Sequence, residues 1–125
     1  MHDPFVFKIF RPSEWATFRA AGAWSGSPDD VEDGFVHLST AAQIAGTLEK
    51  HFANDPGLVI AAFETQTLGD PLTWEPSRGG ALFPHLYAPL EEVNMLWHED
   101  LSDDADGRDA AAVAAIISHK TRMVR

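Results

Sequence analysis

The sequence predicts a single α+β domain built around a mostly antiparallel sheet. Its 125 residues suit one domain, and a hydrophobic content of 45% is ample for one core. The expected elements follow one another as β-α-β-α-β-β-β-α. Helices fill the first two connections, whereas hairpin-length turns join the middle strands, and this order favours an α+β fold over a doubly wound parallel sheet.

The chain is expected to begin with a strand and a helix. Residues 5–10, FVFKIF, are aromatic and β-branched and therefore predict a strand. Pro12 and Ser13 are typical of a helix start, and Gly22 is typical of its end. Residues 23–34 contain Gly, Pro, Ser and four acidic side chains, so we expect a long loop there.

A second strand and helix follow this loop. Residues 35–39, FVHLS, predict a short strand. Thr40 with Gln43 three residues later has the spacing of a capping box, which predicts a helix over 41–53. Apolar side chains recur on one face of this helix at Ile44, Leu48 and Phe52.

The middle of the chain predicts strands joined by turns. Residues 58–65 are apolar on both faces, so they predict a central strand. Residues 72–76 predict another, which ends at Pro76 because proline cannot donate to a ladder. The stretch 78–90 contains two glycines and two prolines and is expected to be irregular, and 93–98 alternates as a last strand.

The C-terminal segment differs in composition from the rest. An acidic, polar loop precedes an alanine-rich helix expected over 108–119. One face of this helix carries apolar residues that we expect to be buried, namely Val113, Ile116 and Ile117. Residues 1–125 are thus expected to form one domain, with a body over 5–98 and an added loop and helix over 99–125.

The formal net charge of −10 argues against functions that need a basic surface. Residues 1–98 contain only five Lys and Arg side chains, so a surface for duplex nucleic acid is not expected. A small anionic ligand held by one or two Arg side chains stays compatible with this charge. The sequence shows no apolar run of membrane-spanning length, no signal-peptide pattern and no cysteine, so we expect a cytoplasmic protein without disulfides or thiolate chemistry.

His37 and Ser39 form the first candidate site. Strand alternation puts both on one face if Val36 and Leu38 face the core. An imidazole and a hydroxyl at this spacing can together hold a ribose diol or a carboxamide. The alternative is a structural histidine whose ring is bound by a backbone carbonyl.

The second candidate site lies in the stretch 78–90. Arg78 offers two parallel hydrogen bonds to a phosphate or carboxylate, and the glycines after it allow close backbone approach. The alternative is a tight turn with a solvated arginine. His85 and Tyr87 share a side with Phe83, and the prolines stiffen the segment. This aromatic face suits either stacking on a flat ring or the plain edge of a core.

Two further chemistries find little support in the sequence. A metal site could combine His37, His85, His98 and Glu75, but neither H-x-x-x-H nor H-E-x-x-H occurs, so no metal is expected. A Ser–His–acid triad would use Ser39 or Ser77. Neither serine stands in a G-x-S-x-G turn.

Two long motifs resemble a known family. DGFVHLSTAAQ (33–43) and WEPSRGGALFPHLYAPL (74–90) are similar to the signature of a small bacterial family of unknown function, number nine-fifty-two. The resemblance covers about residues 5–98. It implies a split, mostly antiparallel sheet with packed helices, like that of the ADP-ribosyltransferase superfamily, which includes the RNA 2′-phosphotransferases.

The resemblance also implies roles for single residues. His37, followed by Ser39, matches the pair that holds the nicotinamide ribose of NAD in that superfamily, and Tyr87 is the candidate for the tyrosine that stacks on nicotinamide. The candidates for the glutamate that orients the ribose are Glu75, Glu91 and Glu92. We assign His37 and Glu75 as catalytic, and the ligand-binding residues as Ser39, Arg78, His85 and Tyr87, with Arg78 near the diphosphate.

The resulting expectation is a protein that binds NAD or a related nucleotide and transfers or hydrolyses ADP-ribose. The alternative is a non-catalytic module on the same fold that binds a small ligand or a partner. Both require that the assigned residues converge on one pocket, although the two motifs lie far apart in the sequence.

Overall fold

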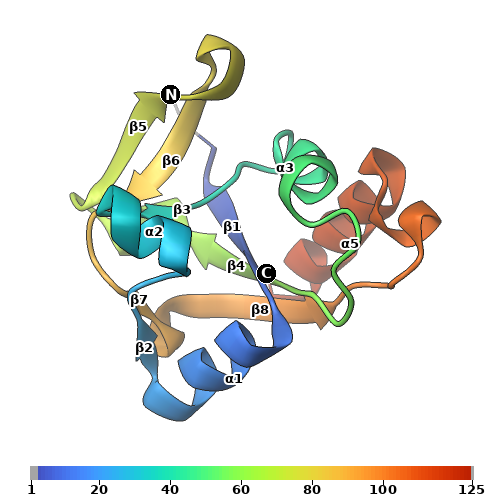
Figure 1. Ribbon diagram of the computed structural model, residues 1–125, viewed down its shortest axis with the longest axis horizontal. Coiled ribbons are helices and arrows are strands. Elements are labelled where there is room, and N and C mark those ends of the chain that lie inside the picture. Colours follow the sequence, from blue (N-terminus) through green and yellow to red (C-terminus); the bar gives the residue numbers. More distant parts are fainter. Residues whose placement is uncertain (1–2, 125) are drawn as a thin grey trace.

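The computed structural model describes residues 3–124, with every side chain in that range except that of Arg78. Antiparallel sheets and helices make up this range, so the expected α+β class is confirmed (Figure 1). None of the helices among the described residues is long and apolar enough to cross a membrane.

The largest sheet has the order β1-β4-β8, with both neighbouring pairs antiparallel. Its strands are β1 (Phe5–Phe10), β4 (Val59–Glu64) and β8 (Met95–Asp100). The central position predicted for 58–65 is confirmed, and the β4 residues Val59 to Phe63 are all buried. The last strand begins at Met95 rather than at 93, because Glu92–Asn94 form a 3-10 turn.

A second sheet has the order β3-β6-β5 and is also antiparallel. It consists of β3 (Val36–His37), β6 (Leu82–Leu86) and β5 (Leu72–Pro76). A third, two-stranded sheet pairs β2 (Ala23–Trp24) with β7 (Leu90–Glu91). The expectation that 78–90 is irregular is therefore wrong. Pairing with β5 and β3 orders β6 despite Pro84, whose carbonyl accepts from the backbone N–H of Leu38 at 3.0 Å.

The two larger sheets meet at one point. Phe7 of β1 forms an isolated antiparallel bridge with Ser39, and the two backbone N–H···O distances are 2.8 and 3.0 Å. Elsewhere the sheets diverge, as Figure 1 shows for β5 and β6 against β1 and β4. This split positions the chain after β3 beside β1.

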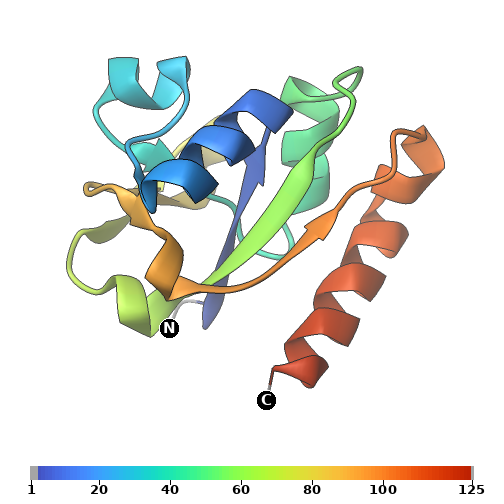
Figure 2. The same ribbon diagram turned by 90° about the horizontal axis from the view of Figure 1, so that it is seen from below.

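Helices cover both faces of the largest sheet (Figures 1 and 2). The α-helices of the described range are α1 (Pro12–Ala21), α2 (Pro28–Asp33), α3 (Ile44–His51), α4 (Thr65–Leu68) and α5 (Ala110–Met123), of which α2 packs beside β3 of the second sheet. Phe18 of α1 packs with Val6 and Phe10 in one hydrophobic cluster. Ile44 of α3 and Val113 of α5 belong to a second cluster, which contains the opposite β1 face. Strand alternation therefore divides the core into two layers.

The prediction of a long loop over 23–34 is wrong, because this segment contains β2 and α2. The side chain of Ser27 accepts from the backbone N–H of Asp30 at 3.2 Å, and the Asp30 carboxylate accepts from the backbone N–H of Ser27 at 3.0 Å. Pro28 occupies the first turn. These residues form a capping box with an N-terminal proline, which is enough to start a short helix.

The helix predicted over 41–53 is shorter than expected. The side-chain carbonyl of Gln43 accepts from the backbone N–H of Thr40 at 3.0 Å, as the capping box predicts, yet regular helix spans only Ile44–His51. The other end of the Gln43 amide donates to the Leu82 carbonyl of β6 at 2.8 Å. Gln43 thus ties the start of α3 to the second sheet.

The C-terminal helix begins at Ala110, two residues later than predicted, and continues to Met123. The Asp109 carboxylate caps it by accepting from the backbone N–H of Ala112 at 2.8 Å. Of the three residues expected to be buried, only Val113 is fully so; Ile116 and Ile117 are partly buried. The expected burial is therefore confirmed for one residue and too strong for the other two, because α5 lies at the margin of the core (Figure 2).

Deletion of residues 110–125 is expected to lower the melting temperature. The truncation uncovers Trp97 and Leu101, which pack in the same cluster as Val113. Losing one fully buried valine and two half-buried isoleucines costs about 3–6 kcal/mol, which corresponds to a fall of roughly 10–25 °C. Calorimetry measures this shift. The control, His119→Gln on the exposed face of α5, should melt like the parent chain; an unchanged melting temperature on truncation would show that α5 is a mere appendage.

Candidate functional site

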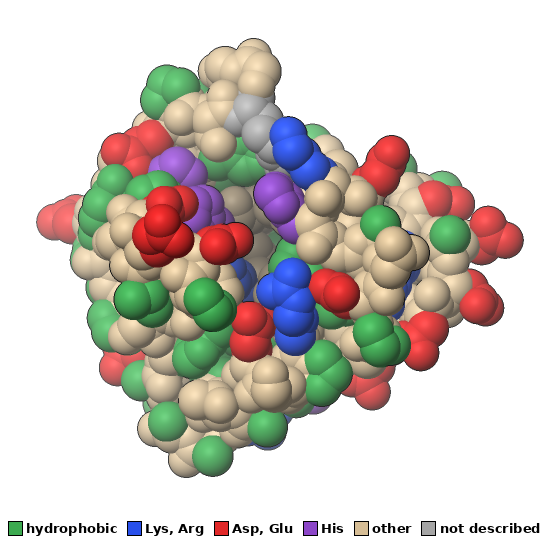
Figure 3. Space-filling model, viewed as in Figure 1, with side chains coloured by type: hydrophobic (Ala, Val, Ile, Leu, Met, Phe, Trp, Pro, Cys, Tyr) green, Lys and Arg blue, Asp and Glu red, His purple; other side chains and the backbone are tan. Residues whose placement is uncertain are grey.

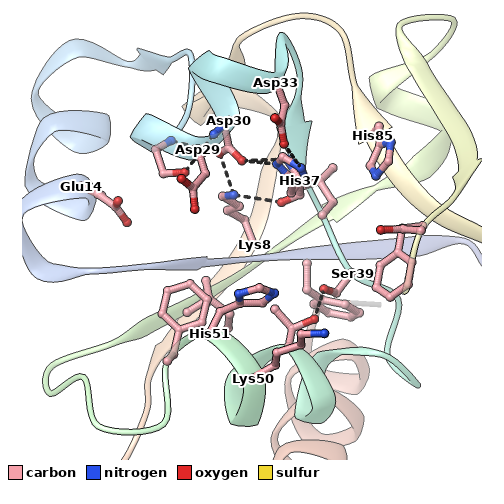
Figure 4. A pocket seen from close by; sticks show the side chains of 18 of the residues that line it. Lys8, Glu14, Asp29, Asp30, Asp33, His37, Ser39, Lys50, His51 and His85 are labelled. Carbon is pink, nitrogen blue, oxygen red and sulfur yellow. Dashed lines mark hydrogen bonds and ion pairs between the residues drawn. The ribbon is translucent and has the colours of Figure 1, made fainter. Parts of the chain in front are cut away.

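A cavity of about 550 Å³ opens between α2 and β3 on one side and α3 on the other, with β1 beneath (Figure 4). It lies where the two larger sheets diverge. Side chains from both walls face it, including His37 of β3, His51 of α3, and Ser39 from the segment that joins these two elements. Figure 3 shows the hollow flanked by histidines, with acidic side chains gathered on the left rim and Lys or Arg side chains on the right.

Lys8 lies beneath the cavity as a buried cation. Strand alternation puts it on the same β1 face as Val6 and Phe10, where an ordinary lysine would be costly. Its Nζ donates to Oδ2 of Asp30 at 2.8 Å and to the backbone carbonyl of His37 at 2.9 Å. Burial lowers the pKa of Lys8, and the charge of Asp30 opposes that shift.

Asp30 is the carboxylate that makes this burial tolerable. It is 2% exposed and accepts hydrogen bonds from Lys8, from the backbone N–H of Ser27 at 3.0 Å and from the backbone N–H of His37 at 3.1 Å. Burial alone raises the pKa of Asp30. The hydrogen bond from the His37 ring and the charge of Lys8 outweigh burial and hold this pKa well below its usual range.

His37 is held by carboxylates on both sides of its ring. Its Nδ1 lies 2.6 Å from Oδ1 of Asp30, and its Nε2 lies 3.0 Å from Oδ2 of Asp33 at the end of α2. Because a carboxylate only accepts, Nδ1 is the donor to Asp30, and Nε2 is placed to donate to Asp33 whenever it carries a proton. The side chain is 37% exposed, so its outer edge is accessible from the cavity.

His85 has a similar support on the neighbouring strand. Its Nδ1 lies 2.8 Å from Oε1 of Glu75, and the Tyr87 hydroxyl donates to the same oxygen at 2.7 Å. The hydrogen bonds from Tyr87 and then His85 lower the pKa of Glu75. The bond to Glu75 raises the pKa of Tyr87. Glu75 therefore stays ionised and fixes the orientation of the His85 ring.

Phe35 connects the two histidines and the tyrosine. The centroid of its ring lies 4.6 Å from that of His37, 4.1 Å from that of His85 and 5.1 Å from that of Tyr87. His37 and Tyr87 are therefore on the same side of the molecule. Phe35 stands between them, however, and Tyr87 lines a separate, shallower hollow of about 300 Å³.

Ser39 and α3 form the opposite wall of the cavity. The Ser39 hydroxyl is buried and lies 2.9 Å from the Thr47 hydroxyl of α3. Lys50 and His51 follow on the same helix and also line the cavity. Figure 4 shows them across from Asp29 and Asp33 of α2. The cavity thus has an acidic wall and, opposite it, a wall that carries the Lys50 ammonium and the His51 imidazole.

The sequence-predicted residues are only partly brought together. His37, Ser39 and His85 line the large cavity, whereas Glu75 and Tyr87 are absent from its described lining. The backbone of Arg78 lies in a 3-10 turn after β5, and its side chain is outside what the structure describes. The other glutamate candidates also lie elsewhere: Glu91 pairs in β7, and Glu92 forms an ion pair with Arg19 of α1.

Among the described residues, 3–124, no three His, Asp or Glu side chains are placed so that together they could hold a metal ion. His98 makes its contacts with α1. Its ring packs on Trp15, and its Nε2 lies 3.1 Å from the Arg19 guanidinium. Burial, followed by the nearby Arg19 charge, lowers the pKa of His98.

Sequence reasoning missed Lys8 and Asp30, although both left a signal. A lysine inside the apolar run FVFKIF, on the face that also bears Val6 and Phe10, requires a buried anion. The motif Ser27-Pro28-Asp29-Asp30 has the pattern of a helix start, with the last aspartate at the capping-box position. Together these observations would have directed attention to the acidic segment.

The chain matches a known protein family over most of its length. A family model described as a protein of unknown function, DUF952, matches residues 9–98. The chain belongs to the DUF952 family. The matched range includes the end of β1, α2, β3, α3 and β6, but it leaves out Phe7 and Lys8 of the cavity lining as well as α5. No curated protein matches the chain.

Solved structures that are similar to this chain include those of protein CC0527 from Caulobacter crescentus. Its crystal structure is 44% identical, covers 83% of this chain and 91% of its own, and superposes with a TM-score of 0.79. Its solution NMR structure, also 44% identical, covers 84% and 90% with a TM-score of 0.74. The DUF952 fold described above is therefore shared with a bacterial relative.

Proposed function

We propose that this DUF952 chain binds NAD or a related nucleotide in the large cavity and transfers or hydrolyses its ADP-ribose. One observation carries the proposal: His37, oriented by the buried Asp30, faces a cavity whose opposite wall carries cations. A polar, oriented imidazole of this kind suits a ribose hydroxyl. The expected resemblance to the ADP-ribosyltransferase superfamily agrees with it but adds no geometry.

The division of charge supports a ligand with two chemically different ends. A diphosphate fits the wall with Lys50 and His51, with Arg11 near the same opening. The nicotinamide ribose fits against His37 and the acidic wall. Breaking the glycosidic bond builds positive charge on that ribose, and the carboxylates of Asp29 or Asp33 would stabilise it.

A second candidate function is a non-catalytic ligand-binding module. The position of Glu75 favours it, because this glutamate supports His85 and Tyr87 instead of facing the cavity. The two functions differ in product. Release of nicotinamide from NAD, followed by chromatography, indicates catalysis, whereas NAD that binds and is recovered intact indicates a module.

Lys50→Gln is expected to weaken binding of ADP-ribose about tenfold, since one charge-assisted hydrogen bond to phosphate is worth about 1.5–3 kcal/mol when it is well formed. Isothermal titration with ADP-ribose and with NAD measures the affinity. Lys120→Gln is the matched control, because Lys120 pairs with Glu99 on the α5 side of the molecule. Equal affinities in all three proteins would place the diphosphate elsewhere.

A further inference from the structure

Two histidines lie side by side on one wall of the cavity, each with its own carboxylate. The register of β3 and β6 puts His37 directly opposite His85. Their ring centroids are 5.4 Å apart and their planes meet at 67°. Figure 4 shows both imidazoles on the same side, across from Lys50 and His51. Both rings line the cavity.

The contacts of the two rings suit them to different roles in proton transfer. Each Nδ1 lies within 2.8 Å of a carboxylate oxygen, so each Nδ1 carries a proton and Nε2 is left as the atom for chemistry. Nε2 of His37 faces a further carboxylate, that of Asp33, and donation to it requires a second proton. His85 has one carboxylate contact, which leaves its Nε2 as an acceptor. His37 is thus arranged as an acid and His85 as a base.

The surroundings keep this arrangement rigid. Phe35 packs against both rings, and the Glu75 that holds His85 is itself fixed by the Tyr87 hydroxyl. Asp33 is half exposed at the end of α2 and can be displaced by an incoming phosphate. Lys50 of α3 stands opposite, at the place where such a phosphate would be neutralised.

We propose that this cavity also cleaves the phosphodiester of small ribonucleotides by internal transfer, an activity separate from the proposed use of NAD. His85 Nε2 takes the proton of the ribose 2′-hydroxyl, and the 2′-oxygen attacks the adjacent phosphorus. The bond from phosphorus to the 5′-oxygen breaks, and His37 Nε2 gives its proton to that oxygen. The products are a 2′,3′-cyclic phosphate and a free 5′-hydroxyl, with the two histidines left in exchanged proton states that water restores.

The same features limit the substrate. A neighbouring 2′-hydroxyl is required as the nucleophile, so a deoxyribonucleotide cannot react. The net charge of −10 repels long nucleic acids, and the cavity volume of about 550 Å³ suits a dinucleotide. Because one histidine must be neutral and the other protonated, the rate must fall at both acidic and alkaline pH.

The test uses the full chain with the ribodinucleotide UpA, in the presence of a chelator, with chromatography of the products. We expect 2′,3′-cyclic UMP and adenosine, no reaction of the 2′-deoxy analogue, and a bell-shaped pH profile. His37→Gln and His85→Gln should each slow the reaction by about 10²-fold or more. His119→Gln, a histidine of α5 outside the cavity, is the matched control and should keep the full rate.

Several results would overturn the proposal: no turnover by the parent chain, a rate that His37→Gln leaves intact, or turnover of the deoxy analogue. If His85→Gln fails to fold, Glu75→Gln serves in its place, and it should shift the acidic limb of the pH profile, which reports the base, while the chain stays folded. Binding of NAD is measured separately. An active nuclease that ignores NAD contradicts only the proposed function, and the reverse result contradicts only this activity.

Discussion

Asp30→Ala is expected to destabilise the fold by about 3–5 kcal/mol, because removal of one partner leaves a buried charge uncompensated. The charge left behind is that of Lys8, whose Nζ lies 2.8 Å from the lost carboxylate. The substitution also removes acceptors used by the His37 ring and by the first turn of α2. Chemical denaturation monitored by tryptophan fluorescence measures the change.

The double variant Lys8→Met/Asp30→Ala is the sharper measurement. If the cost of the single change comes from an unpaired cation, removing that cation restores about 1 kcal/mol or more. If the two substitutions simply add, the ion pair is not the cause. Lys50→Met, on the exposed face of α3, is the control for loss of a lysine charge alone.

The difference in unfolding free energy between the parent chain and Asp30→Ala should depend on pH in a definite direction. The pKa of Asp30 is lower in the folded chain than in the unfolded chain, where an aspartate titrates at about 3.9. Its contribution is therefore fully present above that pH and is lost as pH falls through the folded pKa. The stability gap between the parent chain and Asp30→Ala should be constant from pH 7 to about pH 5 and should narrow below about pH 4.

His37→Ala is expected to reduce binding of ADP-ribose by about 10- to 100-fold, while costing less than about 1 kcal/mol of stability. The ring is partly exposed and offers the ligand a charge-assisted hydrogen bond worth about 1.5–3 kcal/mol. Asp30 keeps Lys8 and two backbone donors after the change, so it is not left without partners.

Titration calorimetry and denaturation of the same samples separate the two effects. His119→Ala, on the exposed side of α5, controls for removal of an imidazole. The opposite pattern, with affinity preserved and stability reduced by several kcal/mol, would make His37 a structural residue. That result would leave Lys50 and His51 as the remaining candidates for ligand contacts.

The sequence predicts those elements whose signals are local. The run FVFKIF, the proline at Pro12 and the alanine-rich segment before Met123 give β1, α1 and α5 nearly at their observed bounds. β6 was not predicted, because its order comes from pairing with β5 and β3 and not from its own composition. The α2 helix was overlooked because it has only six residues and sits in acidic, turn-rich sequence.

The residues of the candidate site also differ in whether a local sequence pattern could predict them. His37, Ser39 and His85 could be found because strand alternation states which side chains share a face. Asp30 could not be connected to His37 by any periodic pattern, since a capping box and a tight turn at Gly34 bring it back under the ring. Tyr87 shares the strand face of His85, yet the Phe35 ring separates it from the large cavity, and side-chain packing of that kind has no one-dimensional signature.

The order β1-β4-β8 has a consequence for how the chain folds. Phe5 pairs with Glu64, so the first sheet closes only after all of α1, α2, β3 and α3 have been gathered into one loop. Closing that loop costs conformational entropy before the strand pairing contributes any stabilising free energy. Contacts of such long sequence separation therefore slow folding. The charged residues beneath the cavity span the same loop, with Lys8 at its beginning and Asp30 in its middle. A chain released from the ribosome before β4 is complete therefore contains every cavity-lining residue of α2 and α3 but has no sheet to hold them together.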